Sequence, residues 1–135
     1  MAEPFVLRII APDRIFYEGE VCFVEFNTTE GQVGIYARHI PMTNVLSTGV
    51  VSIYEREKTE EPKQAALHSG FVEILEDQIT ILAEAVEWPD EIDFHRAEEA
   101  RIRAERRLHE HNGAIDMPRA ELALKRALVR LKFNK

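Results

Sequence analysis

Short runs rich in hydrophobic residues, one of which alternates with polar residues at 21–28, recur through the first two thirds of the chain, and each run ends at residues that are typical of turns. Such a pattern predicts short β-strands with one buried face. The first run, residues 5–10, stops at Ala11-Pro12-Asp13. The other predicted strands are residues 21–28, 49–54, 65–68, 71–75 and 78–83. Many short strands at close spacing are typical of an all-β sandwich or barrel.

The last third of the chain is rich in Ala, Leu, Arg and Glu and has the pattern of two amphipathic helices. Their starts repeat, because residues 92–97 (Ile-Asp-Phe-His-Arg-Ala) recur as residues 115–120 (Ile-Asp-Met-Pro-Arg-Ala). In each copy an aspartate, Asp93 or Asp116, can accept hydrogen bonds from the free N–H groups of the first helical turn. The Asn112-Gly113 pair between the runs favours a chain reversal. The sequence therefore predicts a C-terminal antiparallel α-helical hairpin.

The apolar residues of these helices predict how the hairpin packs. On a helical wheel, small residues of the first helix, Ala97 and Ala104, lie beside Leu108. Alanines at these positions would let the second helix approach closely. The apolar stripe of the second helix consists of Met117, Ala120, Leu124, Ala127, Leu128 and Leu131.

Charge divides the chain where the pattern changes. Residues 1–92 carry 6 basic and 17 acidic side chains, a net charge of −11, and residues 93–135 carry 11 basic and 7 acidic ones, a net charge of +4. Together with the break at Trp88-Pro89, this predicts a β-sandwich at residues 1–88 and a two-helix hairpin at residues 89–135. A basic hairpin on an acidic body suggests that the hairpin contacts a negatively charged group. That group could belong to the body, to a partner protein or to a phosphorylated ligand.

Arginines gather on particular faces of the two predicted helices. Arg96 and Arg103 share a stripe with Asp93, and Arg126 and Arg130 line one side of the second helix. A hairpin folded between the helices would bring these guanidinium groups together, where they could bind a polyanion.

The alternative interpretation of these arginines is a solvated helix face. On that face, ion pairs such as Glu99 with Arg103 and Glu121 with Lys125 would each contribute a few tenths of a kcal/mol. Spacing alone leaves both interpretations open.

No part of the sequence indicates a catalytic or metal centre. It has no glycine-rich phosphate loop, no metal-ligand spacing of Cys and His, and no nucleophile motif. The single cysteine, Cys22, lies in a strand run and is expected to be buried. No apolar run approaches the roughly 20 residues that span a bilayer, so we expect no direct membrane insertion.

Several motifs follow one another in an order that is specific, although each is weak alone. They are residues 12–14 with 17–19, 30–35, 39–41, 70–73, 80–83 and both helix starts. Over about residues 5–131 this arrangement resembles the epsilon subunit of bacterial F-type ATP synthase. The chain departs from that family at two places: Ala37-Arg38 replaces the usual Pro-Gly, and Ser69 replaces the first of two glycines.

The resemblance implies a non-catalytic rotor subunit of a proton-translocating ATP synthase. Its sandwich would bind the gamma subunit and the c-ring, and its hairpin would either fold down or extend along gamma toward the alpha and beta subunits. The extended hairpin would restrain ATP hydrolysis. The protein would be peripheral, on the cytoplasmic face of the bacterial plasma membrane.

In some bacilli the folded hairpin of this subunit also binds ATP as a regulatory ligand, through an Ile/Leu-Asp-x-x-Arg-Ala motif and further arginines. The motif is intact here at residues 92–97. By similarity, the residues facing the adenine would be Glu87, Ile92, Asp93 and Ala97. Those facing the phosphates would be Arg96, Arg103, Arg126 and Arg130. The resemblance leaves open whether magnesium accompanies the nucleotide.

Two other functions compete with the rotor subunit. A nucleic-acid-binding module would use the arginine-rich helices, but the net charge of −11 on the body argues against it, and we expect no nucleic-acid partner. A freestanding ATP sensor would lack the apolar docking face that a rotor subunit needs.

Overall fold

The computed structural model describes residues 3–110 and 116–134. The chain forms two compact units, Met1–Glu87 and Trp88–Lys135, so the division falls one residue before the boundary expected from the sequence. The predicted reversal at Asn112-Gly113 and the first residue of the second helix repeat, Ile115, lie outside the described residues.

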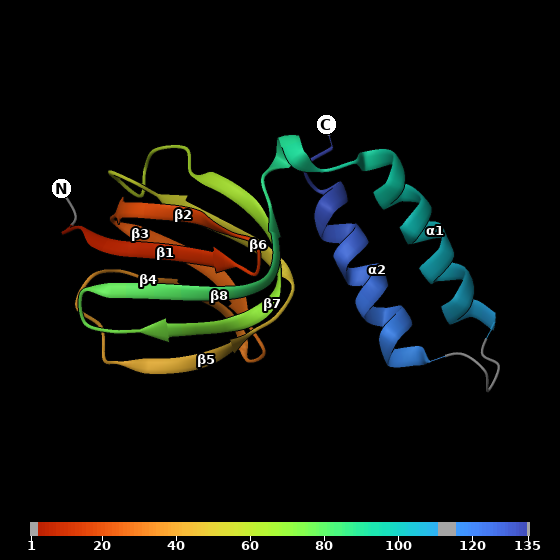
Figure 1. Ribbon diagram of the computed structural model, residues 1–135, viewed down its shortest axis with the longest axis horizontal. Coiled ribbons are helices and arrows are strands. Elements are labelled where there is room, and N and C mark those ends of the chain that lie inside the picture. The colour runs from red at the N-terminus through yellow and green to blue at the C-terminus, as the bar shows by residue number, and fades with distance from the viewer. Residues whose placement is uncertain (1–2, 111–115, 135) are drawn as a thin grey trace. The chain divides into compact units, whose positions relative to one another are not determined.

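The first unit is built of strands (Figure 1). In chain order they are β1 (Phe5–Ala11), β2 (Arg14–Val21), β3 (Phe23–Thr28), β4 (Gly31–Ile35), β5 (Met42–Leu46), β6 (Gly49–Tyr54), β7 (Lys63–Ile74) and β8 (Gln78–Glu87). In strand β1, Phe5, Leu7 and Ile9 are buried while Val6 between them is exposed, so successive side chains point to opposite faces of the sheet.

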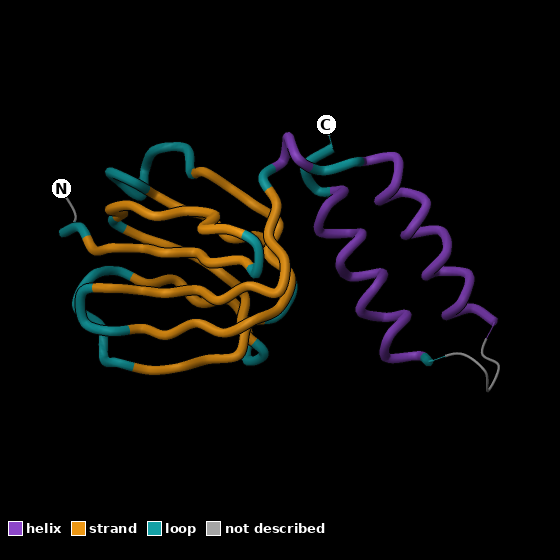
Figure 2. The backbone as a smooth tube through the Cα atoms, in the orientation of Figure 1, coloured by secondary structure: helices purple, strands orange, loops and turns teal. Residues whose placement is uncertain are grey.

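The strands form one sheet in the order β2-β1-β8-β7-β5-β3-β4, and β6 pairs with both β3 and β7. All pairs are antiparallel except β1 with β8. The sheet curls into two layers (Figure 2), and the predicted all-β sandwich is therefore confirmed. Its interior holds the largest fully buried side chains, which include Phe26, Leu7, Ile9, Leu46, Ile53, Ile74, Ile79 and Ile81.

Strand β7 differs from the prediction of two separate strands at residues 65–68 and 71–75. It is continuous, pairing with β6 along its first half and with β5 along its second. At the predicted break, Ser69 and Gly70 take φ angles of +58° and +139°, so the strand is distorted without ending. A Cβ atom on Gly70 would lie 2.0 Å from the carbonyl oxygen of Leu82, so only glycine fits at this close approach.

The two departures from the family's pattern coincide with unusual backbone. Arg38, at φ +61°, and Ser69 are the non-glycine residues with positive φ in the described part of the chain. Left-handed angles cost an L-residue about 1–2 kcal/mol. The glycines of the family's pattern would adopt them without this cost.

The second unit contains a short 3₁₀ helix, η1 (Pro89–Glu91), and the helices α1 (Phe94–Glu110) and α2 (Met117–Leu131). The two α-helices pack against each other in antiparallel directions (Figure 2). The interface uses small residues, as predicted: Ala97, Ala104, Ala120 and Ala127 are all buried. Leu128 was expected in the apolar stripe but is 44% exposed, and the neighbouring Val129 is buried instead.

Candidate functional site

The start of α1 carries the motif that suggested a nucleotide site. Oδ1 of Asp93 accepts a hydrogen bond from the backbone N–H of Arg96 at 3.0 Å, and the carbonyl of Asp93 accepts one from Ala97 at 3.0 Å. Asp93 is therefore the N-cap of α1, as predicted. Asp116 caps α2 in the same way, accepting from the backbone N–H of Arg119 at 3.1 Å.

Two further motif residues have structural roles. Ile92 is 7% exposed and Ala97 is 3% exposed, so they anchor the start of the helix by packing. Arg96 differs from both because it is exposed. The motif thus fixes the backbone of Arg96, whose exposed side chain projects from the first turn of α1.

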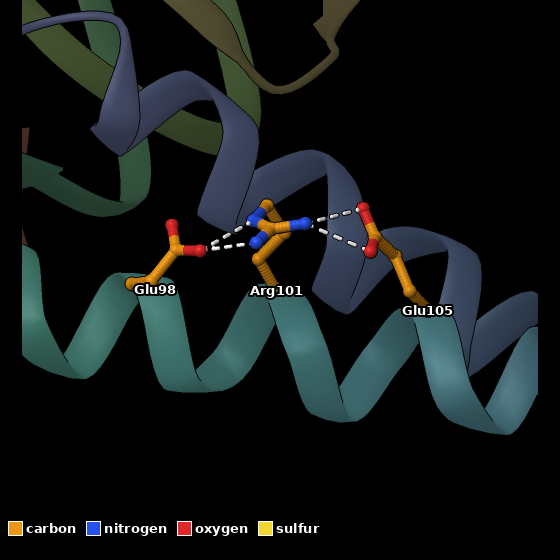
Figure 3. A network of polar contacts seen from close by, with 3 residues as sticks. All are labelled: Glu98, Arg101 and Glu105. Carbon is orange, nitrogen blue, oxygen red and sulfur yellow. Dashed lines mark hydrogen bonds and ion pairs between the residues drawn. The ribbon is translucent and has the colours of Figure 1, made fainter.

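The arginines of α1 fall into two kinds. Arg101 is held by two carboxylates of its own helix, Glu98 and Glu105, and its Nη1 lies 2.8 Å from Oε2 of Glu105 (Figure 3). These contacts raise the pKa of Arg101 and lower that of Glu98. Within the described residues, by contrast, no carboxylate lies at ion-pair distance from the guanidinium groups of Arg96 or Arg103.

The ion pairs of the solvated-face alternative do not form in the part of the chain that the structure describes. Glu99 pairs with His95 at 2.9 Å rather than with Arg103. Glu121 and Lys125 form no ion pair with each other there. The charges of Arg96 and Arg103 thus stay available to a ligand.

The antiparallel packing sets the position of the α2 arginines. It brings the C-terminal end of α2 beside the start of α1 (Figure 1). Arg126 and Arg130, both half-buried, lie on the last turns of α2. They are therefore at the same end of the helix pair as Asp93 and Arg96.

Glu87, the remaining predicted residue, is the last residue of β8 and belongs to the strand unit. Its Oε1 lies 3.1 Å from Nε2 of His68, a fully buried residue of β7. Sequence reasoning placed His68 in a strand and gave it no role. The available signal was an imidazole at the end of an otherwise apolar run, Ala65-Ala66-Leu67.

An exposed row of apolar side chains crosses five strands of the sheet. Register makes them neighbours: Val45 pairs with Phe71, Phe71 with Leu82, Leu82 with Ile10, and Ile10 with Ile15. Four of the five are about half exposed, between 48% for Val45 and 57% for Ile15. We call these five residues the apolar row.

The adjacent row on the same face is polar. It consists of Thr43, Glu73, Thr80, Arg8 and Glu18, which are paired in the same way. The apolar row is therefore a bounded surface feature, and contiguous exposed apolar surface of this kind marks an interaction site.

A second apolar projection follows β4. Ile40 is 81% exposed, whereas the neighbouring His39 packs its ring edge-on against Phe5. Burial lowers the pKa of His39. On the other side of His39, Nε of Arg38 pairs with Glu3 at 3.1 Å. These contacts hold the backbone of the loop and leave Ile40 exposed at its tip.

The described residues contain no cluster of three or more His, Cys, Asp or Glu side chains that could hold a metal ion. None of the described helices is both long and apolar enough to cross a membrane. A sandwich with an apolar outer row, joined to a basic helix pair, defines a protein built for assembly.

The comparisons with known proteins identify the assembly. Residues 4–89 match the family model of the ATP synthase delta/epsilon chain β-sandwich domain, and residues 90–133 match that of its long α-helix domain. The ATP synthase epsilon chain of Caldanaerobacter subterraneus subsp. tengcongensis is 43% identical over 134 residues, 98% of this chain and 95% of its own. That of Clostridium kluyveri is 42% identical over the full length of both.

A solved structure shares the fold at low sequence identity. It is a chain in the cryo-EM structure of the Euglena gracilis mitochondrial ATP synthase, with a TM-score of 0.78 and 19% identity over 90% of this chain and 76% of that one. The chain belongs to the ATP synthase delta/epsilon family, as an epsilon chain. It is a non-catalytic subunit of the enzyme, as the sequence indicated.

Proposed function

We propose that this subunit is part of the rotor and divides two tasks between its units. The strand unit docks the gamma subunit and the c-ring, and the helical unit restrains ATP hydrolysis and senses ATP. The observation that carries the docking role is the apolar row, which is exposed in the chain alone and is bordered by polar residues. A freestanding ATP sensor or a nucleic-acid module would have no use for such a surface.

The apolar row is the proposed docking face for gamma. Its members lie on consecutive strands of one sheet, so they form a flat surface onto which a helical or extended partner can pack. The exposed side chain of Ile40 is the proposed contact with the c-ring. Solved relatives are chains of ATP synthase assemblies that include the c-ring, which supports this assignment.

The helical unit has the properties that a regulatory element requires. Its helices pack through alanines, which bury little apolar area, so separating them costs less than opening the sandwich. The net charge of +4 on residues 93–135 would favour contact with acidic surfaces of the beta subunit when the helices extend along gamma toward alpha and beta.

ATP binding is the proposed signal that keeps the helices folded. Arg96 and Arg103 have no carboxylate partner among the described residues, and Arg126 and Arg130 lie at the same end of the pair as Arg96. These guanidinium groups fit a triphosphate, with Glu87, Ile92, Asp93 and Ala97 toward the adenine by family similarity. A ligand that binds only the folded pair shifts the population toward it.

The same proposal sets the location of the subunit. Docked on gamma and the c-ring, it is peripheral to the membrane, on the cytoplasmic face of the bacterial plasma membrane. Proton transport and ATP synthesis belong to the whole complex.

Docking is tested with point variants of the apolar row. Phe71→Asp should abolish binding to the isolated gamma subunit in a pull-down, because the charge would be buried at the interface. Thr80→Asp, in the adjacent polar row, is the matched control and should bind like the wild type. Equal binding by all three proteins would show that gamma docks elsewhere.

Regulation is tested by truncation. Enzyme rebuilt with residues 1–87 should still assemble but should hydrolyse ATP faster than enzyme rebuilt with the full chain, because the blocking helices are gone. Equal hydrolysis rates would show that the helical unit does not restrain this enzyme.

A further inference from the structure

Glu73 lies in the polar row, directly beside the apolar row. On β7 the side chains of Phe71 and Glu73 are exposed, whereas those of Val72 and Ile74 are buried. Phe71 and Glu73 thus point to the same face of the sheet, about 7 Å apart along the strand. A partner that covers Phe71 therefore comes within reach of the Glu73 carboxylate.

The described residues supply no cation to the Glu73 carboxylate. Its neighbours in the polar row are Thr43 on β5 and Thr80 on β8, both uncharged. Arg8, the basic residue of the row, lies one strand beyond Thr80 and is paired with Glu18 at 2.7 Å. In the part of the chain that the structure describes, no Lys, Arg or His side chain lies at ion-pair distance from Glu73. The polar row therefore holds one matched charge pair and one carboxylate that is open to a partner.

The dimensions of the apolar row fit one face of an α-helix. The five strands that carry the row lie side by side (Figure 1). Neighbouring strands are about 4.8 Å apart, so the row is about 19 Å long. A helix of about 13 residues has that length, and its pitch of about 5.4 Å brings one apolar side chain per turn near each strand. A basic side chain on the flank of such a helix that faces the polar row would meet Glu73.

Charge favours a basic partner at this place. The net charge of −11 on residues 1–92 attracts cationic surfaces. Docking would also remove the Glu73 carboxylate from water, which costs free energy unless a cation pairs with it through hydrogen bonds. A partner that places an apolar or acidic side chain against Glu73 is therefore disfavoured.

We propose that Glu73 determines which helix the docking face accepts, by forming an ion pair with a Lys or Arg of the gamma subunit on a helix whose apolar stripe lies along the apolar row. The inference rests on the proposed function, which assigns the apolar row to gamma. It adds the chemistry by which this surface selects its partner. The apolar row supplies the contact area, and the carboxylate sets the register of the helix on it.

The test measures the association and dissociation rates of full-chain variants on immobilised gamma subunit. Glu73→Gln keeps the shape of the side chain but removes its charge, so the affinity should fall about tenfold, mainly through faster dissociation. Glu73→Lys places two like charges together and should reduce the affinity by at least about a hundredfold. The matched control is Glu61→Gln, because Glu61 is an exposed carboxylate between β6 and β7 that belongs to neither row. Its affinity should stay within about twofold of the wild type.

Salt dependence gives a second readout of the ion pair. The affinity of the wild type should fall more steeply with rising salt than that of Glu73→Gln, which has lost the pair. Thr80→Asp adds a second carboxylate beside Glu73 for the same cation and should not weaken binding. Thermal unfolding of each variant reports folding, and these exposed substitutions should change stability little.

The outcomes distinguish the inference from the function beneath it. Wild-type binding that Phe71→Asp leaves unchanged overturns the docking face and the inference with it. Loss of binding in Phe71→Asp, together with wild-type affinity in Glu73→Gln, overturns the inference alone. An equal loss in Glu73→Gln and Glu61→Gln also overturns it, because the effect would then come from net charge rather than from a contact at Glu73.

Discussion

The two units bury different kinds of side chain. The strand unit encloses Phe26, Leu7, Ile9, Leu46 and Ile53, each 2% exposed or less. Among the described residues of the helical unit, those that are buried are Ile92, Ala97, Ala104, Ala120, Ala127 and Val129. Stabilisation by burial scales with the apolar area that is buried. The strand unit is therefore expected to be stable by itself, whereas the helix pair buries mainly small side chains and gains little stability from its packing.

The two units also differ in how their charged side chains are paired. In the strand unit Arg8 pairs with Glu18 at 2.7 Å, and Glu55 binds both Tyr17 and Lys63. In the helical unit Arg96 and Arg103 have no carboxylate partner among the described residues. The strand unit thus pairs these charges internally, whereas the helical unit pairs Arg101 and leaves Arg96 and Arg103 for a ligand or partner.

The largest effect that the comparison predicts concerns the units in isolation. Residues 1–87 should fold alone, with strand-type circular dichroism and a cooperative thermal transition. Residues 88–135 should be mostly unfolded at 25 °C, because helices of 17 and 15 residues are marginal without a substantial core. A molten fragment 1–87, or a cooperatively folded fragment 88–135, would contradict the claim that only the strand unit is stable alone.

The next effect tests the core of the strand unit. Phe26→Ala should destabilise residues 1–87 by about 3–5 kcal/mol in urea unfolding, because the side chain is fully buried. Phe71→Ala is the matched control: this side chain is 55% exposed, and the cost should stay below about 1 kcal/mol. Similar costs for both would mean that the layers do not enclose the core described above.

A smaller effect comes from the hydroxyl of Tyr17, which donates to Oε2 of Glu55 at 2.7 Å. Tyr17→Phe should cost about 1 kcal/mol at pH 7. The Tyr17 hydroxyl and the Lys63 ammonium lower the pKa of Glu55. The stability they add is therefore present above the ordinary glutamate pKa and disappears as pH falls through the lowered value. Urea unfolding of the wild type and of Tyr17→Phe should show a smaller difference in the free energy of unfolding at pH 3 than at pH 7. The same difference at both pH values would contradict a hydrogen bond to an ionised Glu55.

The smallest effect concerns the left-handed backbone at Ser69. Ser69→Gly removes the strain of φ +58° but adds freedom to the unfolded chain, so we expect a net gain of about 0.5 kcal/mol. Arg38→Gly should behave alike. Differential scanning calorimetry measures the thermal stability of both variants. A loss of stability in each would show that contacts of the Ser69 and Arg38 side chains offset the cost of their left-handed backbone.

The sequence predicted the division of the molecule because charge and hydrophobic period change together near Trp88. It also predicted both helix caps, since an aspartate before an amphipathic run has a local role that the structure shows at Asp93 and Asp116. Strands β2, β4 and β5 escaped prediction because their sequences lack a sustained hydrophobic period, and pairing with other strands stabilises them. Strand β4, for instance, contains two glycines and pairs along its length with β3.

The candidate site was less accessible to sequence reasoning. Family similarity supplied its residues, and the wheel grouped Arg103 with Arg96, but neither showed which arginines of α1 are paired with carboxylates and which are not. The difference arises in the folded helix, where Glu98 and Glu105 neutralise Arg101. The partner of Glu87 was also beyond reach, because only the register of β7 against β8 brings His68 to it.

ATP sensing by the helical unit is tested by calorimetric titration of the full chain with ATP, comparing variants of Arg103 and Arg101. Arg103→Ala should weaken binding by roughly ten- to a hundredfold, because it removes a charge-assisted contact worth about 1.5–3 kcal/mol. Arg101→Ala should leave the affinity unchanged, since the charge of Arg101 is held by its own helix. No heat from the wild type at millimolar ATP, or equal affinity in the wild type and Arg103→Ala, would contradict the claim that the helical unit senses ATP.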